Sequence, residues 1–555
     1  MGYAHNPIAS ILENALVLVY DESIDYKLIR RSDQRVNPLL HRLGSKVKGY
    51  ITGFDRLVFK GMLQPLIHTA ALQGFLRSQG VLNKDYKTWM LSQSTALVQS
   101  VEAYAQATCG QGIVWIPSLH TRKESLAHER QRLTGIRDGL IGVWACLESG
   151  PSFRAHFDRT AGFPQLRPES VRCKHLYFYY DHPVYGFLSV RLQTWLPFGI
   201  QVALNGREWL ARSLDADNCS YFRQGNKFLA IDDYEKAQRH LDTQLDTRWQ
   251  ELLTSFLPNV FPTMKATLGS SMEYYWTVWQ SEWATDLILD SPDSTAPLME
   301  DLLRHAFYTG TGERVLRYLG HPVRPDGQPH PLAKPDVSSR LSVWHDGARI
   351  RHWADNNSVK LYNEHNVIRI ETTINRPDRF KVYRHKQGQS KDEPKQRLPL
   401  RKGIADLPLR ARVSEEVNQR FAAHVATFTD TTPLREVLAT VQAHTRSGRS
   451  VRALDPMGKD LLLLQAIADP ALGIDGITNK ALQRTLAETS WAKGKTGQAL
   501  SARISRHLRL LRDHGLLRKV PNQRRYQLTD KGRQLTTLLD SMLAASTDRL
   551  LQLAA

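Results

Sequence analysis

The chain is poor in cysteine and has no long apolar run. Its 555 residues include four cysteines, and no two of them are spaced as C-x-x-C. This distribution argues against a zinc ribbon or a disulfide framework and fits a reducing compartment. The sequence contains no run of about 18 apolar residues, so no transmembrane helix is expected. The first residues lack the basic, apolar and small-residue order of a secretory leader. We therefore expect a cytoplasmic protein with no membrane partner.

Several sequence patterns of enzyme active sites are also missing. The 20 histidines never form an H-x-H pair, which argues against metal-dependent relaxases of the histidine-pair type. Neither H-E-x-x-H nor G-x-S-x-G occurs, which argues against zinc proteases and serine hydrolases. Gly494–Thr496 matches the end of a phosphate-binding loop, but Thr489 stands where the loop needs its first glycine. An ATPase is therefore not expected.

Positive charge is the strongest feature that is present. The chain has 74 lysines and arginines against 55 aspartates and glutamates, a formal net charge of +19. Such an excess favours a polyanionic partner, because a cationic surface releases the counterions condensed on nucleic acid. The charge is clustered, as in the basic run 381–402, where Lys381 and Arg384 are candidate phosphate contacts. We expect DNA as the partner, with RNA as the open alternative.

The length and the order of predicted elements favour an α+β multidomain protein. Strands mixed with helices predict a mixed β-sheet core, which can be ribonuclease-H-like or replication-initiator-like. The oligomeric state stays open, and a dimer is one option. The expected regions are an N-terminal α/β domain (1–150), a β-rich and then helical domain (151–320), a β-hairpin region with a basic loop (321–405), a helical linker (406–455) and a C-terminal domain (456–555).

The most informative stretch is 357–384, which alternates like a hairpin followed by a third strand. A four-residue turn at Asn363–Asn366 would pair Lys360 with Arg369. Since side chains alternate across a strand, one face of this hairpin is then apolar and the other is polar. The polar face concentrates a carboxylate, two cations and a phenol within diagonal reach: Glu371, Lys360, Arg369 and Tyr362.

Four acids lie among apolar or aromatic neighbours, where a carboxylate needs a partner or a metal. Asp55 falls between two short strands expected within Val47–Gly61, and Glu371 lies in the hairpin. The aromatic-rich stretch Tyr274–Leu289 is expected to be a helix, or a strand and then a helix, with two acids one turn apart. Convergent carboxylates can hold Mg²⁺ for in-line attack on a phosphodiester. The predicted metal ligands are Asp55, Glu282, Asp286 and Glu371, with Lys360 and Arg369 stabilising phosphate charge.

Each of these acids is equally explained by a salt bridge or a helix cap. Their order, an early strand Asp, then an acid, then Glu, is similar to that of ribonuclease-H-type transposases and nucleases. That resemblance implies a metal-dependent DNA-processing enzyme. One departure weakens it, because the last acid of that family is usually on a helix, whereas Glu371 is on a predicted strand.

The hairpin has a second resemblance. Lys360-Leu361-Tyr362, a turn, and Ile368-Arg369-Ile370-Glu371 resemble a block of rolling-circle replication initiators, although Glu364 stands where a Lys is expected. That family works through a tyrosine nucleophile that attacks a DNA phosphate. The resemblance implies the candidates Tyr274, Tyr275 and Tyr362.

The last hundred residues predict helix, helix, helix, basic hairpin, helix. The third helix is expected at Ser501–Asp513 and the strands at Leu516–Val520 and Arg525–Leu528. The phrase HGLLRKVPNQRRYQLTDKGRQL resembles the wing of MarR- and ArsR-type winged helix-turn-helix domains. The resemblance implies base readers on the third helix and wing cations on the DNA backbone. The candidates are Arg503, Ser505, Arg506 and Arg509 on the helix, and Lys519, Arg524 and Arg525 in the wing.

Outside these regions, Arg207 at a predicted helix start is a further phosphate candidate, with a structural Arg–Glu pair as the alternative. The blocks GFDRLVF, NGREWLA, QSEWATD, NSVKLY and RIETTIN are similar to those of an abundant bacterial family of no established activity, whose spread suits a mobile element. The leading hypothesis is a metal-dependent nuclease or transposase. The alternatives are a non-catalytic DNA- or structured-RNA-binding regulator or scaffold, and a tyrosine-dependent initiator.

Overall fold

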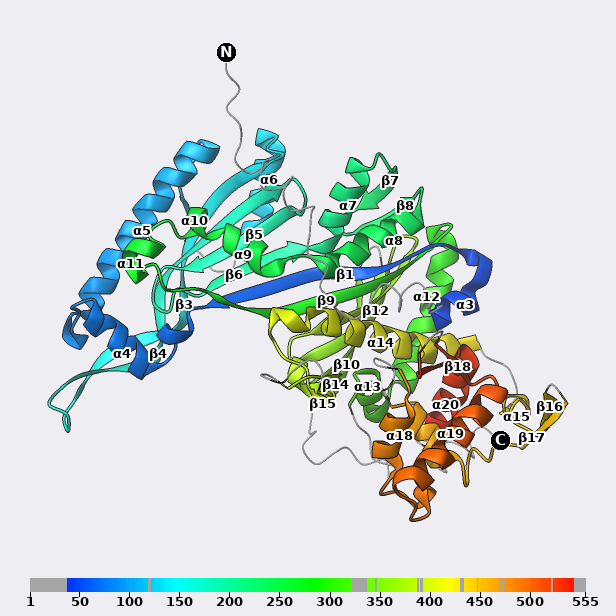
Figure 1. The fold of residues 1–555 in the computed structure, drawn as a ribbon. Helices are drawn as coiled ribbons and strands as arrows, with labels where there is room; N and C mark the ends of the chain where they lie inside the picture. The colour runs from blue at the N-terminus through cyan, green and yellow to red at the C-terminus, as the bar shows by residue number, and fades with distance from the viewer. Residues whose placement is uncertain are drawn as a thin grey trace.

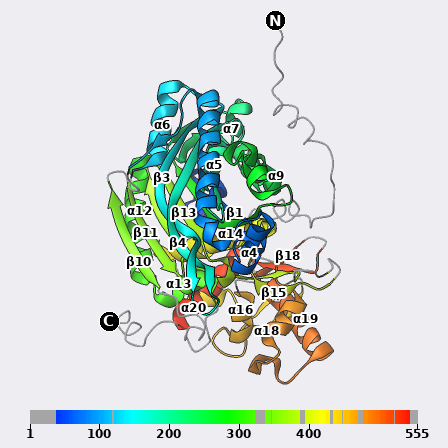
Figure 2. The same cartoon turned by 90° about the vertical axis from the view of Figure 1, so that its left-hand side faces the viewer.

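The computed structural model describes residues 37–543 apart from 118–120, 322–336, 345–346, 387–388, 390–392, 430–433, 447, 470–471, 473–475 and 521–522. One eleven-stranded sheet dominates it, with helices on both faces (Figures 1 and 2). The expected α+β class is confirmed. In sheet order the strands are β10 (Ser338–Trp344), β11 (Gly347–Ala354), β12 (Asn357–Glu364), β13 (Val367–Ile374), β9 (Tyr275–Leu289), β1 (Val47–Met62), β6 (Ile200–Asn205), β5 (Gly186–Gln193), β4 (Phe163–His182), β3 (Gly139–Asp158) and β2 (Val114–Trp115).

Two long strands replace elements that the sequence predicts differently. Val47–Met62 forms the single strand β1, whereas two short strands were expected there. A β-bulge lies between Phe54 and Arg56, where the register with β9 shifts by one residue at Asp55. This bulge explains why the alternation of the sequence breaks there and suggests two strands. Tyr275–Leu289 forms strand β9, so the helix expected there is wrong. The stretch is rich in aromatic and β-branched residues, which fit a half-buried pleated surface.

The hairpin β12–β13 exists, but its register differs from the prediction. Lys360 pairs with Glu371 and Tyr362 with Arg369, because the turn has two residues and not four. His365 adopts φ +52°, as tight hairpin turns require. The shift along β13 is two residues, an even number, so every side chain keeps the face that was expected.

Helices cover most of one face of the sheet. The apolar side chains of β12 and β13 pack there with those of α12, α13 and α14, and those of β1 and β3–β6 pack with helices closer to the N-terminus. The helices of this layer are α4 (Thr69–Ser78), α5 (Tyr86–Cys109), α9 (Trp249–Ser255), α10 (Leu257–Val260), α11 (Met264–Leu268), α12 (Pro292–Thr309), α13 (Gly312–Tyr318) and α14 (Leu407–Val425).

The opposite face, which we call the polar face, is only partly covered. Helix α6 (Lys123–Thr134) packs on β3 and β4, while α7 (Gly206–Ala216) and α8 (Tyr234–Thr243) pack near the ends of β1, β9 and β13. In Figure 1, α7 and α8 lie on one side of β1 and β9, and α14 lies on the other. The small hairpin β7 (Tyr221–Gln224) and β8 (Lys227–Ile231) belongs to the α7–α8 layer.

The C-terminal region forms its own apolar core. Helix α19 begins at Gly497, four residues before the expected Ser501. The linker contains a short hairpin that the sequence did not reveal, β16 (His444–Arg446) and β17 (Arg449–Val451). The other elements are α3 (Pro38–Leu43), β14 (Lys381–Arg384), β15 (Gln396–Pro399), α15 (Leu434–Ala439), α16 (Leu461–Ile467), α18 (Asn479–Leu486), β18 (Leu517–Lys519), β19 (Tyr526–Leu528) and α20 (Asp530–Leu543).

Strands from the three regions expected at 1–150, 151–320 and 321–405 share the one large sheet, and the boundary expected at residue 150 falls inside β3. Among the residues that the structure describes, no helix is both long and apolar enough to cross a membrane.

Candidate acidic centre

Three of the four predicted acids meet on the polar face. Asp55, Glu282 and Glu371 each present a carboxylate oxygen, and these oxygens lie within 4.8 Å of one another. They come from β1, β9 and β13, which are neighbours in the sheet. Residues from three distant parts of the chain therefore build one cluster, which we call the acidic centre.

The bulge in β1 turns the Asp55 side chain towards Glu282, which is opposite the next residue, Arg56. The register passes from the Phe54–Trp283 pair to the Arg56–Glu282 pair, so Asp55 is the extra residue. Phe54 stays in the core, where its ring meets that of Trp283 edge-on at 4.8 Å. Bulges re-aim a side chain in this way and are frequent beside functional sites.

The fourth acid, Asp286, lies outside the acidic centre. Arg369 donates to both of its oxygens, from Nε at 2.5 Å and from Nη2 at 2.8 Å. Arg207 lies 3.1 Å from Asp286 Oδ2. The structure therefore makes Asp286 the counter-ion of two arginines and places this predicted ligand outside the cluster of the other three acids.

Arg369 and Arg207 are enclosed in the protein interior. Arg369 is 1% exposed and Arg207 is fully buried. Besides Asp286, Arg369 binds Asp55 through an Nη1–Oδ1 contact of 2.9 Å. Neither guanidinium can meet a phosphate at the surface as predicted. The alternative Arg207–Glu208 pair is also absent, because Glu208 binds Arg223 at 2.6 Å.

Glu371 is held ionised by two donors from β12. Lys360 Nζ lies 2.5 Å from its Oε1, and the Tyr362 hydroxyl donates to its Oε2 at 2.6 Å. Burial opposes the charge, but the Lys360 ammonium and the two hydrogen bonds outweigh it and hold the pKa of Glu371 below its ordinary value. Lys360 therefore neutralises an acid of the centre in the ligand-free protein.

Asn226 is a site residue that the sequence analysis missed. It lies in the β7–β8 turn, donates from Nδ2 to Asp55 Oδ1 at 2.6 Å, and accepts from Arg369 Nη2 through its backbone carbonyl at 2.9 Å. The neighbouring Lys227 forms an ion pair with Glu364 at the tip of the β12–β13 hairpin. The Gly225-Asn226 dipeptide signals a turn, but a turn signal does not say what the hairpin covers.

Glu282 is the acid with the least compensation. Its only hydrogen bond comes from Gln280 Nε2 at 3.2 Å, and within the described ranges no lysine or arginine lies within 4.0 Å of it. Burial and the nearby Glu371 carboxylate raise the pKa of Glu282 to about 7, and burial also raises the pKa of Asp55. At neutral pH the acidic centre therefore favours an additional proton or a cation.

This raised pKa predicts a specific pH dependence of stability. Between about pH 4.5 and pH 7 the folded chain binds the Glu282 proton more tightly than the unfolded chain does. Folding stability therefore falls as pH rises through this window. In EDTA, the unfolding free energy of the wild type should drop more between pH 5 and pH 8 than that of Glu282→Gln, as measured by urea unfolding at both pH values. Equal drops in the two proteins would contradict this account.

The predicted tyrosines have different surroundings. Tyr274 is buried and donates to the Phe198 carbonyl at 2.7 Å, whereas Tyr275 is exposed at the start of β9. Tyr362 lies beside the acidic centre, but burial and the Glu371 charge hold its pKa well above the ordinary value. Of the three, Tyr362 alone combines a phenol with a neighbouring carboxylate.

The predicted nucleic-acid-binding residues of the C-terminal region lie mostly at its surface. Ser505, Arg506 and Arg509 are exposed on α19, and Lys519 and Arg524 are exposed in or beside the β18–β19 hairpin. The remaining predicted residues are exposed Lys381, and partly buried Arg503, Arg525 and Arg384. The guanidinium of Arg503 lies 4.5 Å from the ring centre of Trp491, and that of Arg384 donates to the Pro399 carbonyl.

A basic groove of about 850 Å³ lies between α19 and the β16–β17 hairpin. The sequence does not reveal this groove, because one of its walls is the unexpected β16–β17 hairpin. Seven arginines and a single acid, Asp513, line it. The arginines are Arg446, Arg449, Arg452, Arg503, Arg506, Arg509 and Arg512.

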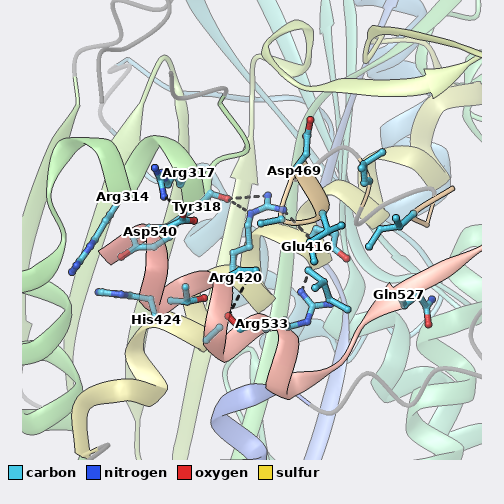
Figure 3. Close-up of a pocket in the computed structure, with 18 of the residues that line it drawn as sticks. Arg314, Arg317, Tyr318, Glu416, Arg420, His424, Asp469, Gln527, Arg533 and Asp540 are labelled. Atoms are coloured by element: carbon cyan, nitrogen blue, oxygen red, sulfur yellow. Dashed lines mark hydrogen bonds and ion pairs between the residues drawn. The ribbon is translucent and has the colours of Figure 1, made fainter. Parts of the chain in front are cut away.

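The C-terminal region also contacts the sheet body around a cavity of about 110 Å³ (Figure 3). Arg317 of α13 binds Asp540 of α20 at 2.6 Å. Arg420 of α14 donates to the Tyr318 carbonyl at 3.0 Å, and Arg533 lies 3.8 Å from Glu416. The first and third of these contacts hold α20 against α13 and α14, and the second joins α14 to α13.

The fold and site define an α+β protein with a buried acidic centre and a separate basic C-terminal region. Comparisons with protein-family models, curated proteins and solved structures found no match to this chain. The geometry of the acidic centre and the distribution of charge are the features from which a function can be inferred.

Proposed function

We propose that the protein is a metal-dependent phosphodiesterase that processes nucleic acid, a nuclease or transposase with DNA as its first substrate. The convergence of Asp55, Glu282 and Glu371 carries this proposal. Three carboxylates on adjacent strands offer the oxygen ligands that a hard divalent cation prefers. The raised pKa values of Asp55 and Glu282 support a functional site here. The excess of 19 positive charges supports a polyanionic substrate.

The residues present fit Mg²⁺. All three donors are carboxylates, and Mg²⁺ prefers oxygen ligands at about 2.1 Å, so two of its ligands are at most about 4.2 Å apart. The three oxygens lie within 4.8 Å of one another, a little wider than that limit, so the side chains would move slightly inward to bind the ion. Bound there, Mg²⁺ would polarise a phosphoryl oxygen and lower the pKa of a water molecule. Lys360 and Tyr362 orient Glu371, and Asn226 and Arg369 orient Asp55.

Lys360 is the cation placed to act on the substrate. Its ammonium lies against Glu371 and is 14% exposed, so it can turn towards a phosphate when a metal ion neutralises that carboxylate. A positive group beside developing phosphoryl charge lowers the barrier of phosphodiester attack.

The proposed DNA-binding module is the C-terminal region, which we interpret as a winged helix-turn-helix. Helices α18 and α19, followed by the β18–β19 hairpin and α20, have the order that this class requires. Helix α19 would enter the major groove with Ser505 and Arg506, while Lys519 and Arg524 would contact the backbone from the wing. The arginine groove between α19 and β16–β17 extends the same surface.

Arg506→Ala should weaken binding of duplex DNA about tenfold or more and relax the sequence preference, since a good base contact contributes about 1–3 kcal/mol. Lys519→Ala should weaken binding of all sequences and lower the slope of log affinity against log salt by about one. Fluorescence anisotropy at several salt concentrations measures both effects. Arg77→Ala, at an exposed position of α4, is the matched control. Unchanged binding by Arg506→Ala would contradict the assignment of α19.

The experiment for the proposed activity uses the full chain with plasmid, single-stranded DNA and structured RNA, in Mg²⁺ or EDTA. Cleavage or strand joining in Mg²⁺ is expected, and it should be absent in EDTA and in the double variant Asp55→Ala/Glu371→Ala. Cleavage that persists in the double variant would overturn the assignment of the centre, and no metal-dependent reaction on any substrate would overturn the proposed activity.

Two alternatives have an observation in their favour. Lys360 and Arg369 already neutralise Glu371 and Asp55, which suits a non-catalytic DNA- or RNA-binding protein. Nucleic acid that copurifies with the chain, digested with DNase or RNase, would identify that partner. The Tyr362–Glu371 contact suits a tyrosine-dependent initiator. That mechanism requires a covalent protein–DNA adduct on denaturing gels, and a Tyr362→Phe variant would lose it.

A further inference from the structure

The polar face carries two exposed tryptophans near the acidic centre. Trp279 in β9 is 42% exposed and Trp353 in β11 is 39% exposed. Large aromatic side chains usually enter a core, so paired exposure around one cluster needs an explanation.

Cations accompany both rings. Lys60 Nζ lies 3.3 Å and Lys402 Nζ 4.8 Å from the ring centre of Trp279. The guanidinium of Arg351 lies 4.8 Å from that of Trp353. In the described part of the chain, none of these three cations lies within 4.0 Å of a carboxylate. Burial, Arg191 and Lys402 lower the pKa of Lys60 to about 8, as expected for positive charge gathered without a counter-ion.

The strand register places Trp353 in one row with Glu282. Trp353 is opposite Ser358, Ser358 is opposite Thr373, and Thr373 is opposite Glu282. Opposed residues point to the same face of a sheet, so Trp353 lies on the polar face at the level of Glu282. The three strand spacings between them amount to about 14 Å.

Trp279 is reached from the centre along β9, at right angles to the direction of Trp353. It precedes Glu282 by three residues, which is about 10 Å along the strand. Val58 is opposite Gln280 and Phe59 is opposite Val278, so Trp279 is the extra residue of a bulge in β9. Lys60, whose ammonium covers Trp279, is on the same face as Arg56 and Glu282, because all alternate positions of β1 after its bulge share that face. On the side of the acidic centre away from Trp279, helices α7 and α8 cover the polar face at Ile51, Ile288 and Val367.

From this arrangement we propose that a single-stranded nucleic acid lies across the polar face, with bases stacked on Trp279 and Trp353 and the phosphate between them at the acidic centre. The inference rests on the proposed function and adds the substrate class, a single strand. Aromatic rings stack on the face of any base, and adjacent cations hold the backbone, so this mode tolerates many sequences. A duplex keeps its bases stacked inside the helix and cannot use the two rings.

The test measures binding of fluorescein-labelled (dT)12 and (rU)12 by anisotropy, with the full chain in EDTA. Stacking contributes about 1–3 kcal/mol per base, so Trp279→Ala/Trp353→Ala should weaken binding of the single strand at least tenfold. Trp279→Phe/Trp353→Phe should retain most of the affinity, because a phenyl ring still stacks. The relative affinities of the two oligonucleotides show whether the strand is DNA or RNA.

The matched control is Trp115→Ala. Trp115 is 48% exposed and has Lys174 Nζ 5.7 Å from its ring centre, but its partner Ala145 belongs to the core on the opposite face. This variant should bind (dT)12 like the wild type. Unchanged binding in the double alanine variant, or an equal loss in Trp115→Ala, would overturn the proposal. The binding assay contains no metal, so its result does not depend on whether the protein cleaves nucleic acid. If the double alanine variant bound and cleaved like the wild type, the stacking proposal would be refuted and the proposed activity would stand.

Discussion

Glu282→Gln is expected to reduce Mg²⁺-dependent cleavage by at least about 100-fold while the chain stays folded. The substitution keeps the shape of the side chain and removes a metal ligand, and a metal that polarises a phosphoryl group contributes several kcal/mol to transition-state stabilisation. Glu282 is the best single test, because no lysine or arginine of the described residues lies within 4.0 Å of it. Its loss therefore leaves no orphaned charge, unlike the loss of Asp55 or Glu371.

The matched control is Glu300→Gln, the same chemical change on the exposed face of α12, where Glu300 binds Arg304 at 2.6 Å. Its rate should equal that of the wild type. Initial rates of cleavage at saturating Mg²⁺ and at increasing Mg²⁺ separate a lost ligand from a lowered affinity. A Glu282→Gln rate within about threefold of the wild type would contradict the assignment.

Arg369→Met should produce the largest loss of stability. Arg369 is 1% exposed and joins Asp286 to Asp55. Removing one partner of a buried ion pair costs about 3–5 kcal/mol, because the remaining carboxylates stay buried without compensation. Denaturant unfolding should show this decrease, whereas Arg304→Met, at an exposed ion pair, should cost less than about 1 kcal/mol.

A double-mutant cycle identifies the cause of that loss. Asp286→Leu added to Arg369→Met removes a carboxylate that the first change left unpaired, so the double variant should be more stable than the sum of the single effects predicts. Additive effects would mean that Arg369 stabilises the fold through packing and not through its ion pairs.

The sequence revealed the two faces of the β12–β13 hairpin because apolar and polar residues alternate there. It did not reveal the register, which depends on the conformation of His365 in the turn. The error left the faces unchanged, since a two-residue shift preserves the alternation. Glu371 and Lys360 were therefore placed on the correct side and became direct neighbours.

The expected helix placed Glu282 and Asp286 on one face, and the observed strand also does so. Positions i and i+4 share a face in a helix and also in a strand, so the conclusion survived although β9 is a strand. Their roles could not be separated from sequence, because Arg207 and Arg369 reach Asp286 from distant positions. The same holds for Asn226, whose contact with Asp55 joins residues 171 positions apart.

The balance of charge explains why the acidic centre can exist before any ligand binds. Arg369 and Arg207 offset Asp286 and Asp55, and Lys360 offsets Glu371. Glu282 is left over, and its raised pKa is the consequence. A divalent cation would release its proton, so the affinity for Mg²⁺ should rise with pH through about 7.

The most direct measurement is an anomalous difference map from crystals of the full chain soaked in Mn²⁺, which prefers the same oxygen ligands as Mg²⁺. We expect a peak bound by carboxylate oxygens of Asp55, Glu282 and Glu371 at about 2.1–2.2 Å. A map with no peak there, at a Mn²⁺ concentration that supports cleavage, would contradict the central claim that these three acids form the metal site.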